Sequence, residues 1–456
     1  MAAMEIIAIE TKALGDRSYV LVDGDVAAVV DPQRDIDRIE ALLSDRHLRL
    51  THVFETHVHN DYVTGGLELS RTHGATYVLA AEDEVAYEHT GARDGDEFTL
   101  GSVVVRAMRT PGHTPNHLAY AVVENGNPVA VFTGGSMLYG TVGRTDLIDD
   151  GSTEPLTRAQ FRSVRRLAVE LSGDVAVHPT HGFGSFCSSA STSGTDHSTI
   201  AQERLANLAL TVDDEDTFVA HLLAGLTAYP RYYVYMAGIN REGPPPVDLS
   251  PPEVVDPVEI RRRIHGGEWV VDLRSRTAFA RRHLAGTVNV EVGDSFATYL
   301  GWTMRWGTPV TLIGDTVDEV AEAQRQMVRI GIDRPAGAAD GGLARWSAGG
   351  DVRRYRSVSF AELAAARADH GVAVLDVRRD DEWADGHVDG AVHIPLHDLE
   401  DRLDEVPGGE VWVHCASGYR AAIAASLLDR AGHPIVAVDD DWAAAAQQGL
   451  PITSAT

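Results

Sequence analysis

Three short segments of the chain carry histidines at places where strands are expected to end. His57 and His59 follow the strand-like run at residues 50–55, His113 follows a Pro-Gly pair, and His181 lies in a third such loop. Histidine is the commonest side-chain ligand of metal ions, and strand-end loops are able to bring several imidazoles into one cleft. The pattern therefore predicts one shared metal site.

A second reactive group is predicted near the C-terminus. A strand-like run at residues 410–414 leads into Cys415, and a helix-forming segment follows Arg420. A cysteine between a strand end and a helix N-terminus faces free backbone N–H groups and the positive end of the helix dipole. These groups stabilise a thiolate and equally the terminal anionic sulfur of a persulfide. We predict Cys415 and Arg420 as catalytic residues, with a persulfide cradle formed by Ala416, Ser417, Gly418 and Tyr419.

The spacing within this loop separates two kinds of chemistry. Cys415 and Arg420 are separated by four residues, whereas the anion-binding loop of protein phosphatases resembles C-x5-R, which is one residue longer. Gly418 allows a tight curl, and Arg420 adds a cation. The smaller loop favours sulfur transfer over phosphate hydrolysis.

Chain patterning indicates how these groups are positioned. Short strands alternate with helices in the first half, which indicates a layered α/β fold. A proline-dense stretch follows, and then two blocks repeat a related pattern, WVVDL at residues 269–273 and AVLDV at residues 373–377. We predict a metal domain at residues 1–243, a linker at 244–253, a domain without cysteine at 254–350 and a domain with Cys415 at 357–456.

The block at residues 254–350 lacks the sulfur chemistry of its repeat. Its second strand, at residues 309–313, is followed by Gly314, Asp315 and Thr316, with no cysteine and no arginine in the loop. An acidic loop of this kind does not supply a sulfur nucleophile. We therefore expect a spacer or docking unit.

Composition excludes several classes of partner. The 456 residues include 67 acidic and 39 basic ones, giving a net charge of −28, which repels nucleic acid and anionic membranes. Cys187 and Cys415 are the two cysteines, so a disulfide framework is excluded. No signal peptide and no membrane-length apolar run is visible, so a cytoplasmic location is expected.

The motifs resemble a known family. T-H-x-H-x-D at residues 56–61 and P-G-H-T at 111–114 are typical of the metallo-β-lactamase superfamily, and G-R-T-D at 143–146 resembles its persulfide dioxygenase branch. The later blocks resemble rhodanese domains, the first of them degenerate. The resemblance implies an α/β fold: a metallo-β-lactamase αββα sandwich followed by two rhodanese-like domains with mainly parallel sheets.

This resemblance also implies a cofactor and substrates. One Fe(II) per chain would be bound by His57, His113 and an aspartate, with Zn as the alternative. The partners would be a thiol persulfide, oxygen, and sulfite or thiosulfate, and a homo-oligomer is compatible with the family. The implied function is oxidation of a low-molecular-weight thiol persulfide to sulfite, coupled to sulfane-sulfur transfer at Cys415.

Two positions depart from the family pattern. Gly135 stands where the metal-binding aspartate is expected, and Tyr62 stands where the superfamily has a further histidine. The loss of that histidine argues against a second metal. Possible third ligands are His59, Asp61 and His181, and possible substrate contacts are Arg144, Cys187 and Tyr62.

Two other interpretations remain open on these residues. A zinc-dependent thioester hydrolase of the glyoxalase type would use the same histidines. A sulfur-relay protein with an inactive metal domain would explain Gly135, because a glycine has no side chain with which to bind a metal. Arg144 is either an anion contact or the partner of Asp146 in an ion pair.

Overall fold

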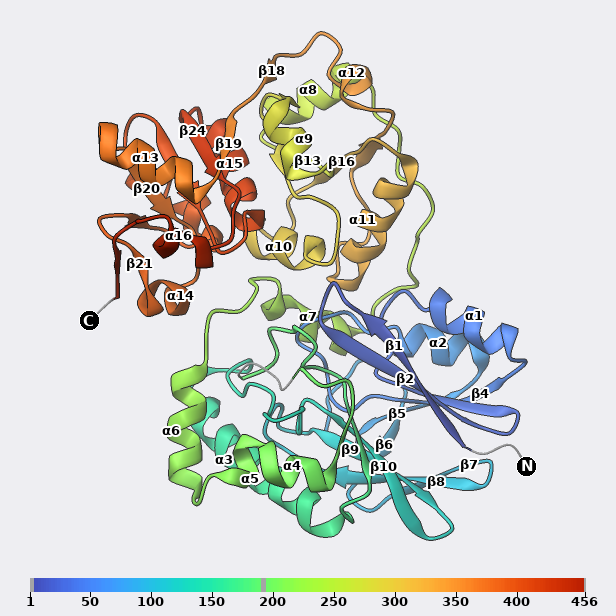
Figure 1. Cartoon of the computed structure of the whole chain (residues 1–456). Helices are drawn as coiled ribbons and strands as arrows, with labels where there is room; N and C mark the ends of the chain where they lie inside the picture. The colour runs from blue at the N-terminus through green and yellow to red at the C-terminus, as the bar shows by residue number, and fades with distance from the viewer. Residues whose placement is uncertain (1–3, 190–193, 455–456) are drawn as a thin grey trace. The chain divides into compact units, whose positions relative to one another are not determined.

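A computed structural model describes residues 4–189 and 194–454. The chain divides into two compact units. The first comprises Met1–Val247 with the short segment Val328–Gly331, and the second comprises Asp248–Met327 and Ile332–Thr456. Each unit is described by itself below (Figure 1). Within the described ranges, no helix is long and apolar enough to cross a membrane.

The first unit contains two six-stranded sheets that face each other. One sheet has the order β1-β2-β3-β4-β5-β6 and the other β12-β11-β10-β9-β8-β7. The strands are β1 (Glu5–Thr11), β2 (Asp16–Asp23), β3 (Val26–Val30), β4 (Arg49–Phe54), β5 (Thr76–Ala80), β6 (Thr90–Ala92), β7 (Glu97–Leu100), β8 (Val103–Arg109), β9 (Leu118–Glu124), β10 (Asn127–Gly134), β11 (Ala176–Pro179) and β12 (Ser198–Thr199). Apolar side chains from both sheets, such as Phe54 and Phe132, form one core between them.

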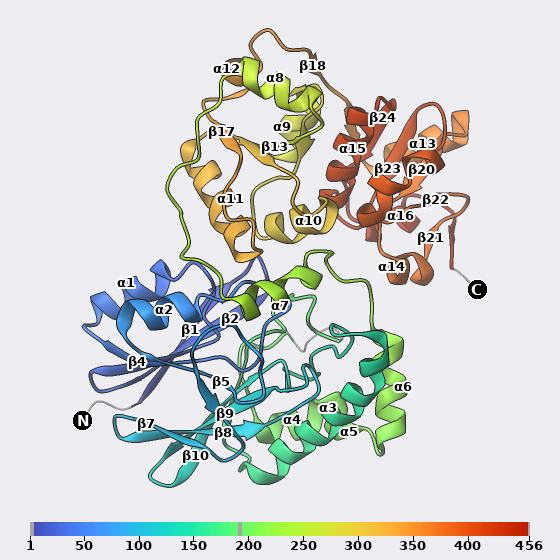
Figure 2. The same ribbon diagram turned by 180° about the vertical axis from the view of Figure 1, so that it is seen from behind.

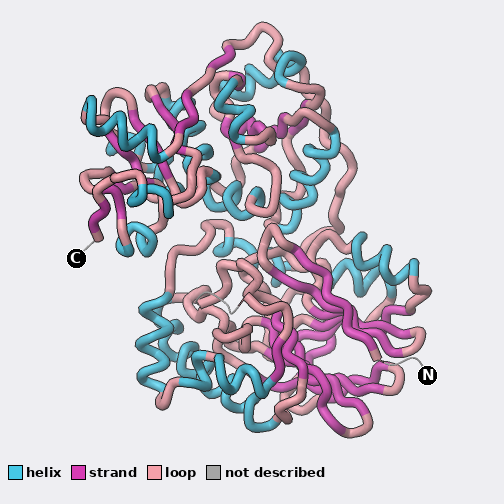
Figure 3. Tube along the Cα trace, in the orientation of Figure 1, coloured by secondary structure: helices cyan, strands magenta, loops and turns pink. Residues whose placement is uncertain are grey.

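Helices cover the outer faces of both sheets, which gives an αββα arrangement (Figures 1 and 2). A second core lies between α1, α2 and the first sheet, and a third lies between the second sheet and the helices that follow it. The helices are α1 (Asp37–Asp45), α2 (Gly66–His73), α3 (Asp150–Glu170), α4 (Ile200–Ala206), α5 (Leu208–Thr211), α6 (Glu215–Gly225) and α7 (Tyr233–Glu242). The central strands and outer helices are distinguished by colour in Figure 3.

Strand ends deliver the histidine loops that the sequence singles out. Strand β4 runs parallel to β3 and ends at Phe54, two residues before Thr56 and three before His57. Strand β11 runs parallel to β10 and ends at Pro179, two residues before His181. Because β3 and β4 are parallel and β10 and β11 are parallel, the residues that follow the two strands of each pair are brought to one edge of the sheet.

The second unit contains two parallel sheets. The first has the order β15-β13-β16-β17 and the second β19-β24-β23-β20-β22. Every pairing within them is parallel. Their strands are β13 (Trp269–Asp272), β15 (Val288–Asn289), β16 (Val310–Ile313), β17 (Gly337–Ala339), β19 (Arg356–Val358), β20 (Ala373–Asp376), β22 (Val392–His393), β23 (Val411–His414) and β24 (Ile435–Val438).

Two small antiparallel pairs and several helices complete the second unit. The pairs are β14 (His283–Leu284) with β18 (Val352–Arg353) and β21 (His387–Val388) with β25 (Ile452–Thr453). The helices are α8 (Pro257–His265), α9 (Arg276–Arg281), α10 (Phe296–Thr303), α11 (Val317–Arg329), α12 (Leu343–Trp346), α13 (Phe360–His370), α14 (Asp380–Asp385), α15 (Tyr419–Ala431) and α16 (Ala443–Gln447), with 3-10 turns η1 (Leu396–Asp401) and η2 (Leu403–Glu405).

The two halves of this second unit share one hydrophobic core. Phe296 and Leu300 of α10 belong to the same buried cluster as Leu427 and Leu428 of α15. Helix α15 packs on β15, and α10 packs on η1. The two repeats therefore stabilise each other through buried apolar contacts.

The loop after β16 shows why the first repeat lacks an anion site. The backbone N–H groups of Asp315 and Thr316 donate to Oε2 of Glu319, at 2.6 and 3.3 Å. These are the groups that would surround an anion at the start of a helix. The protein's own carboxylate, that of Glu319, occupies them in this loop.

The shared core leads to a prediction for the isolated C-terminal repeat. We expect residues 357–456 alone to lose several kcal/mol of unfolding free energy relative to residues 248–456, because each buried apolar side chain contributes about 1.5–3 kcal/mol. Urea unfolding and binding of an apolar dye measure the difference. Equal unfolding midpoints for the two fragments would contradict the shared core.

Candidate functional site

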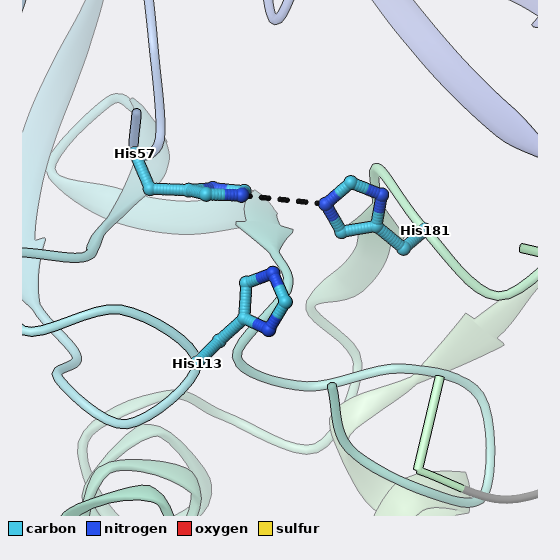
Figure 4. A group of neighbouring side chains, drawn as sticks. All are labelled: His57, His113 and His181. Atoms are coloured by element: carbon cyan, nitrogen blue, oxygen red, sulfur yellow. Dashed lines mark hydrogen bonds between the residues drawn. The ribbon is translucent and has the colours of Figure 1, made fainter. Parts of the chain in front are cut away.

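Three histidines from separate loops converge in the first unit. Nitrogen atoms of His57, His113 and His181 all lie within 4.8 Å of one another, and all three side chains are buried. The Nε2 atoms of His57 and His181 are 3.3 Å apart. Figure 4 shows the three rings pointing toward a common point, with a dashed line joining His57 and His181.

The outward-facing nitrogens of His57 and His113 are fixed by hydrogen bonds. The hydroxyl of Thr56 donates to Asp31, so Nδ1–H of His57 donates to that hydroxyl oxygen at 2.9 Å. Nδ1–H of His113 donates to the carbonyl oxygen of Arg144 at 2.7 Å. Both Nε2 atoms are consequently lone-pair acceptors, which is the form that binds a metal. Burial lowers the pKa of His57 well below its usual value and that of His113 to about 3, so both rings are neutral.

The third ring, that of His181, lies against two buried acids. Its Nδ1 is 2.9 Å from Oδ1 of Asp16 and 3.1 Å from Oδ2 of Asp61. Burial acts to lower the pKa of His181, but the two carboxylates raise it well above its usual value. Burial and the Asp61 carboxylate raise the pKa of Asp16 to about 7. His181 thus turns one nitrogen to the acids and the other to His57.

A fourth histidine, His59, is oriented differently. Its Nε2 lies 3.2 Å from Oδ1 of Asp31 and 3.2 Å from Oε2 of Glu55, and Nδ1 lies 4.0 Å from Asp61. Although burial acts to lower it, these carboxylates raise the pKa of His59 to about 9. One nitrogen of His59 is therefore occupied by acids, while Nδ1 faces Asp61.

The structure adds Asp31 as a residue that the sequence argument missed. Its carboxylate accepts the Thr56 N–H and the Thr56 hydroxyl, each at 2.7 Å, and also the Thr180 hydroxyl. Thr56 precedes His57 and Thr180 precedes His181. Asp31 directly follows the apolar strand β3, and that position at a strand end was the available signal.

Gly135 lies against the ring of His113. A Cβ atom added at Gly135 would overlap that ring. The Gly135 N–H donates to Nε2 of His117 at 3.1 Å, so this additional buried histidine uses the nitrogen that would otherwise bind a metal. The position expected for a metal-binding aspartate is thus filled by close packing.

The predicted substrate contacts have defined partners. Arg144 makes two 2.7 Å hydrogen bonds to Asp146, so its guanidinium forms the ion pair that the sequence left as an alternative. Tyr62 is buried, with its hydroxyl 3.0 Å from Nε2 of His59. Burial, followed by the Asp61 carboxylate, raises the pKa of the Cys187 thiol well above its usual value. Cys187 is therefore a protonated thiol close to the acids.

In the second unit, Cys415 lies between a strand and a helix as predicted. It follows β23 directly, and α15 begins at Tyr419. Gly418 adopts a φ of 87° at the helix N-cap, and an added Cβ there would overlap the carboxylate of Asp439. The first N–H groups of α15 have no partner within the helix and face this loop, which suits a thiolate or a persulfide anion.

The cation of the loop is paired. Arg420 donates to both oxygens of Glu382 in α14, at 2.6 and 2.7 Å. The sequence predicted Arg420 as a fixed cation at the loop, and the structure adds the carboxylate that fixes it. Because the pair is bidentate, the guanidinium has one defined orientation.

The repeat without cysteine contributes directly to the surroundings of this loop. Arg276 donates to Asp439 at 2.8 Å, and Asp439 packs against Gly418. The hydroxyl of Tyr419 donates to the carbonyl oxygen of Glu291 at 2.8 Å, and the Tyr299 ring lies 5.6 Å from the Tyr419 ring. The first repeat therefore contacts the C-terminal end of the Cys415 loop, at Tyr419 directly and at Gly418 through Asp439.

Comparison with known proteins identifies both kinds of domain. Residues 14–181 match the metallo-β-lactamase superfamily, and residues 256–349 and 359–448 each match the rhodanese-like domain. The mitochondrial persulfide dioxygenase of Homo sapiens is 30% identical over 208 residues, which are 45% of this chain and 73% of that protein. The chain belongs to the metallo-β-lactamase superfamily and carries tandem rhodanese-like domains.

Two further relatives extend the comparison. A solved metallo-β-lactamase from Staphylococcus aureus superposes with a TM-score of 0.68 at 25% identity, covering 74% of this chain and 99% of that one. A hydroxyacylglutathione hydrolase from Methylococcus capsulatus is 37% identical over 142 residues. That match covers 31% of this chain and 51% of the hydrolase, so it spans about half of the relative. The metallo-β-lactamase domain is thus related to oxygenases and to hydrolases.

Asp31 provides a test of how the metallo-β-lactamase domain is held together. We expect Asp31→Asn to lower the unfolding free energy by about 3–5 kcal/mol, because a neutral amide removes one of the two buried carboxylates beside His59 and the acceptor of Thr56 and Thr180. Asp25→Asn, in the exposed β2–β3 turn, is the matched control. Urea unfolding followed by tryptophan fluorescence measures both, and equal stabilities would show that Asp31 is not the organising group.

Gly418 provides a test of the rhodanese loop. Gly418→Ala and Gly432→Ala both place alanine at a φ near 88°, which costs about 1–2 kcal/mol. An added Cβ meets Asp439 only at position 418, whereas nothing lies within 4 Å at position 432. We expect Gly418→Ala to lose most sulfur-transfer activity while Gly432→Ala retains it, as measured by thiocyanate formation from thiosulfate. Similar activities would mean that the loop is not tightly set by Asp439.

Proposed function

We propose that the protein oxidises a low-molecular-weight thiol persulfide to sulfite with oxygen and transfers sulfane sulfur through Cys415. One observation carries this proposal: a cluster of three buried histidines and a strand–loop–helix cysteine occur in the same chain. Each alone fits many reactions. Sulfur oxidation joined to sulfur transfer accounts for both, and relatives with the name persulfide dioxygenase support it.

The histidine cluster is suited to hold one iron(II) ion. Nε2 of His113 has no hydrogen-bond partner among the described residues and is buried, as expected of an atom reserved for a metal. Bound iron would supply oxygen activation, and His57 and His113 would hold it with a further ligand. The protein shields this site from bulk water, since every ring in it is buried.

The proposed oxidation balances as RSSH + O2 + H2O giving RSH, hydrogen sulfite and one proton. The outer sulfur loses four electrons, which reduce both oxygen atoms of O2, and the S–S bond is cleaved with the thiol as leaving group. Asp16, Asp61 and His181 form a connected set of buried groups beside the site. They are placed to accept the released proton.

The proposed transfer uses Cys415 as the nucleophile. Its thiolate attacks the outer sulfur of RSSH, forming the Cys415 persulfide and releasing RS⁻. Sulfite then attacks the outer sulfur of that persulfide, which gives thiosulfate, a proton and the Cys415 thiolate. The helix N-terminus after Gly418 stabilises the anionic sulfur before and after each exchange. Joining the two domains raises the effective concentration of sulfite near Cys415.

Two other functions are each favoured by one observation. Hydroxyacylglutathione hydrolase relatives favour a zinc-dependent thioester hydrolase. Against that, Tyr62 packs on His59 where a second metal would need a histidine, and His59 itself faces Asp31 and Glu55. Gly135 favours a sulfur-relay protein whose first domain binds no metal. Both alternatives predict that the purified protein consumes no oxygen.

We expect a substitution at Cys415 to affect sulfur transfer without affecting the metal site. Cys415→Ser should abolish thiosulfate sulfurtransferase activity by at least 10³-fold, because a hydroxyl does not carry sulfane sulfur. It should leave iron content and persulfide-dependent oxygen uptake unchanged, while Cys187→Ser, the control, should keep the transferase activity. Anaerobic purification, metal analysis and oxygen-electrode measurements on the same preparations provide the readouts.

Zinc without oxygen uptake, together with hydrolysis of a thioester, would contradict the proposal and favour the hydrolase. Absence of both metals, in protein that still transfers sulfur, would favour the relay protein. Sulfurtransferase activity that survives Cys415→Ser would remove Cys415 from the reaction.

A further inference from the structure

The absence of a side chain at Gly135 raises the question of what completes the metal site. A carboxylate cannot simply be restored at this position, because a Cβ atom would overlap the His113 ring. Gly135 is also tied on both sides: its N–H donates to His117, and its carbonyl oxygen accepts from Gly143 at 3.0 Å. The His113 ring and the hydrogen bonds of the Gly135 backbone thus leave no space for a side chain at this position.

His181 has the properties of the missing ligand. In His57, His113 and His181 alike, Nδ1 is engaged by a neighbouring oxygen and Nε2 points inward. Two nitrogens bound to one metal at about 2.0–2.1 Å lie roughly 3 Å apart, and the Nε2 atoms of His57 and His181 are 3.3 Å apart. The three histidines therefore form one set by their hydrogen bonding as well as by their position.

We propose that His181 replaces the missing aspartate as the third metal ligand, and that Asp16 and Asp61 supply the lost negative charge from behind it. This inference deepens the proposed function, on which it rests for the identity of the metal. Carboxylates that accept the second N–H of a ligating histidine fix its ring and raise its basicity. Asp16, hydrogen-bonded to Nδ1 at 2.9 Å, is placed for this role, and the Asp61 carboxylate, 3.1 Å from the same nitrogen, adds negative charge.

The other two candidates fit less well. His59 directs Nε2 at Asp31 and Glu55, both 3.2 Å away, and its Nδ1 faces Asp61 instead of the His57–His113 pair. Asp61 has Oδ2 on the outer nitrogen of His181, so it belongs to the second layer of groups. The first layer is then His57, His113 and His181, three imidazoles from three loops.

Metal affinity tests the assignment without relying on catalysis. Anaerobically purified full-length protein is stripped, reloaded with Fe(II) or Zn(II), and titrated against a chelator, with the number of histidine ligands read by X-ray absorption. We expect His181→Asn to weaken binding by more than 100-fold and to remove one histidine from the absorption spectrum. Asp16→Asn should weaken binding by about 10–100-fold with all three histidines retained.

Three further variants make the test specific. His59→Gln should retain all three histidines in the absorption spectrum, and His178→Gln, at a histidine on β11 outside the cluster, should leave the metal affinity nearly unchanged. Gly135→Asp should weaken binding, because the new side chain displaces His113. Circular dichroism and thermal unfolding of the apo forms separate loss of a ligand from loss of the fold.

The inference would be overturned if His181→Asn kept wild-type affinity, or if Gly135→Asp tightened binding while His59→Gln abolished it. Oxygen uptake with a thiol persulfide, measured in the same samples, distinguishes failure of the ligand assignment from failure of the proposed dioxygenase function. Metal bound through His181 without oxygen uptake would refute the dioxygenase and leave the ligand assignment standing. Oxygen uptake that is unaffected in His181→Asn would refute the assignment and leave the dioxygenase standing.

Discussion

The buried carboxylate of Asp31 is the group on which the geometry of the first site depends. It lies at the end of β3 with a φ of 50°, and it binds Thr56 and His59 from the loop after β4 and Thr180 from the loop after β11. A buried charge is costly unless several donors surround it. The donors that satisfy Asp31 are the residues next to His57 and His181, so the requirement to solvate one carboxylate also aligns two histidines.

The negative charges of this domain lie behind the histidine rings and not at the point where a metal would bind. Gly135 contributes no charge. The carboxylates that do carry charge each lie against His59 or His181: Asp16, Asp31, Glu55 and Asp61. Acids arranged in this way orient imidazoles and increase their electron density without touching the ion. The arrangement offers a physical reason why a metallo-β-lactamase domain could lose an inner carboxylate and keep a metal site.

The two rhodanese-like domains differ in the loop that follows the corresponding strand, β16 in the first and β23 in the second. After β16, the carboxylate of Glu319 accepts hydrogen bonds from the backbone N–H groups of Asp315 and Thr316. After β23, Cys415 lies at the corresponding place. The first copy has kept its packing surface: Arg276 and Glu291 hold Asp439 and Tyr419 beside the Cys415 loop. Loss of chemistry in one copy is thus compatible with a structural role in the other's site.

The sequence by itself determined the fold class, the repeated domains, His57, His113 and the Cys415 loop, because these follow from local patterns: alternating strands, strand-end motifs and a cysteine before a helix. It left His59, Asp61 and His181 equivalent, and it did not identify Asp16, Asp31 or Glu319. Only the tertiary structure decided which nitrogen of each histidine faces inward, because that depends on hydrogen-bond partners far away in the chain. His181 meets Asp16 across 165 residues, and no local pattern records such a contact.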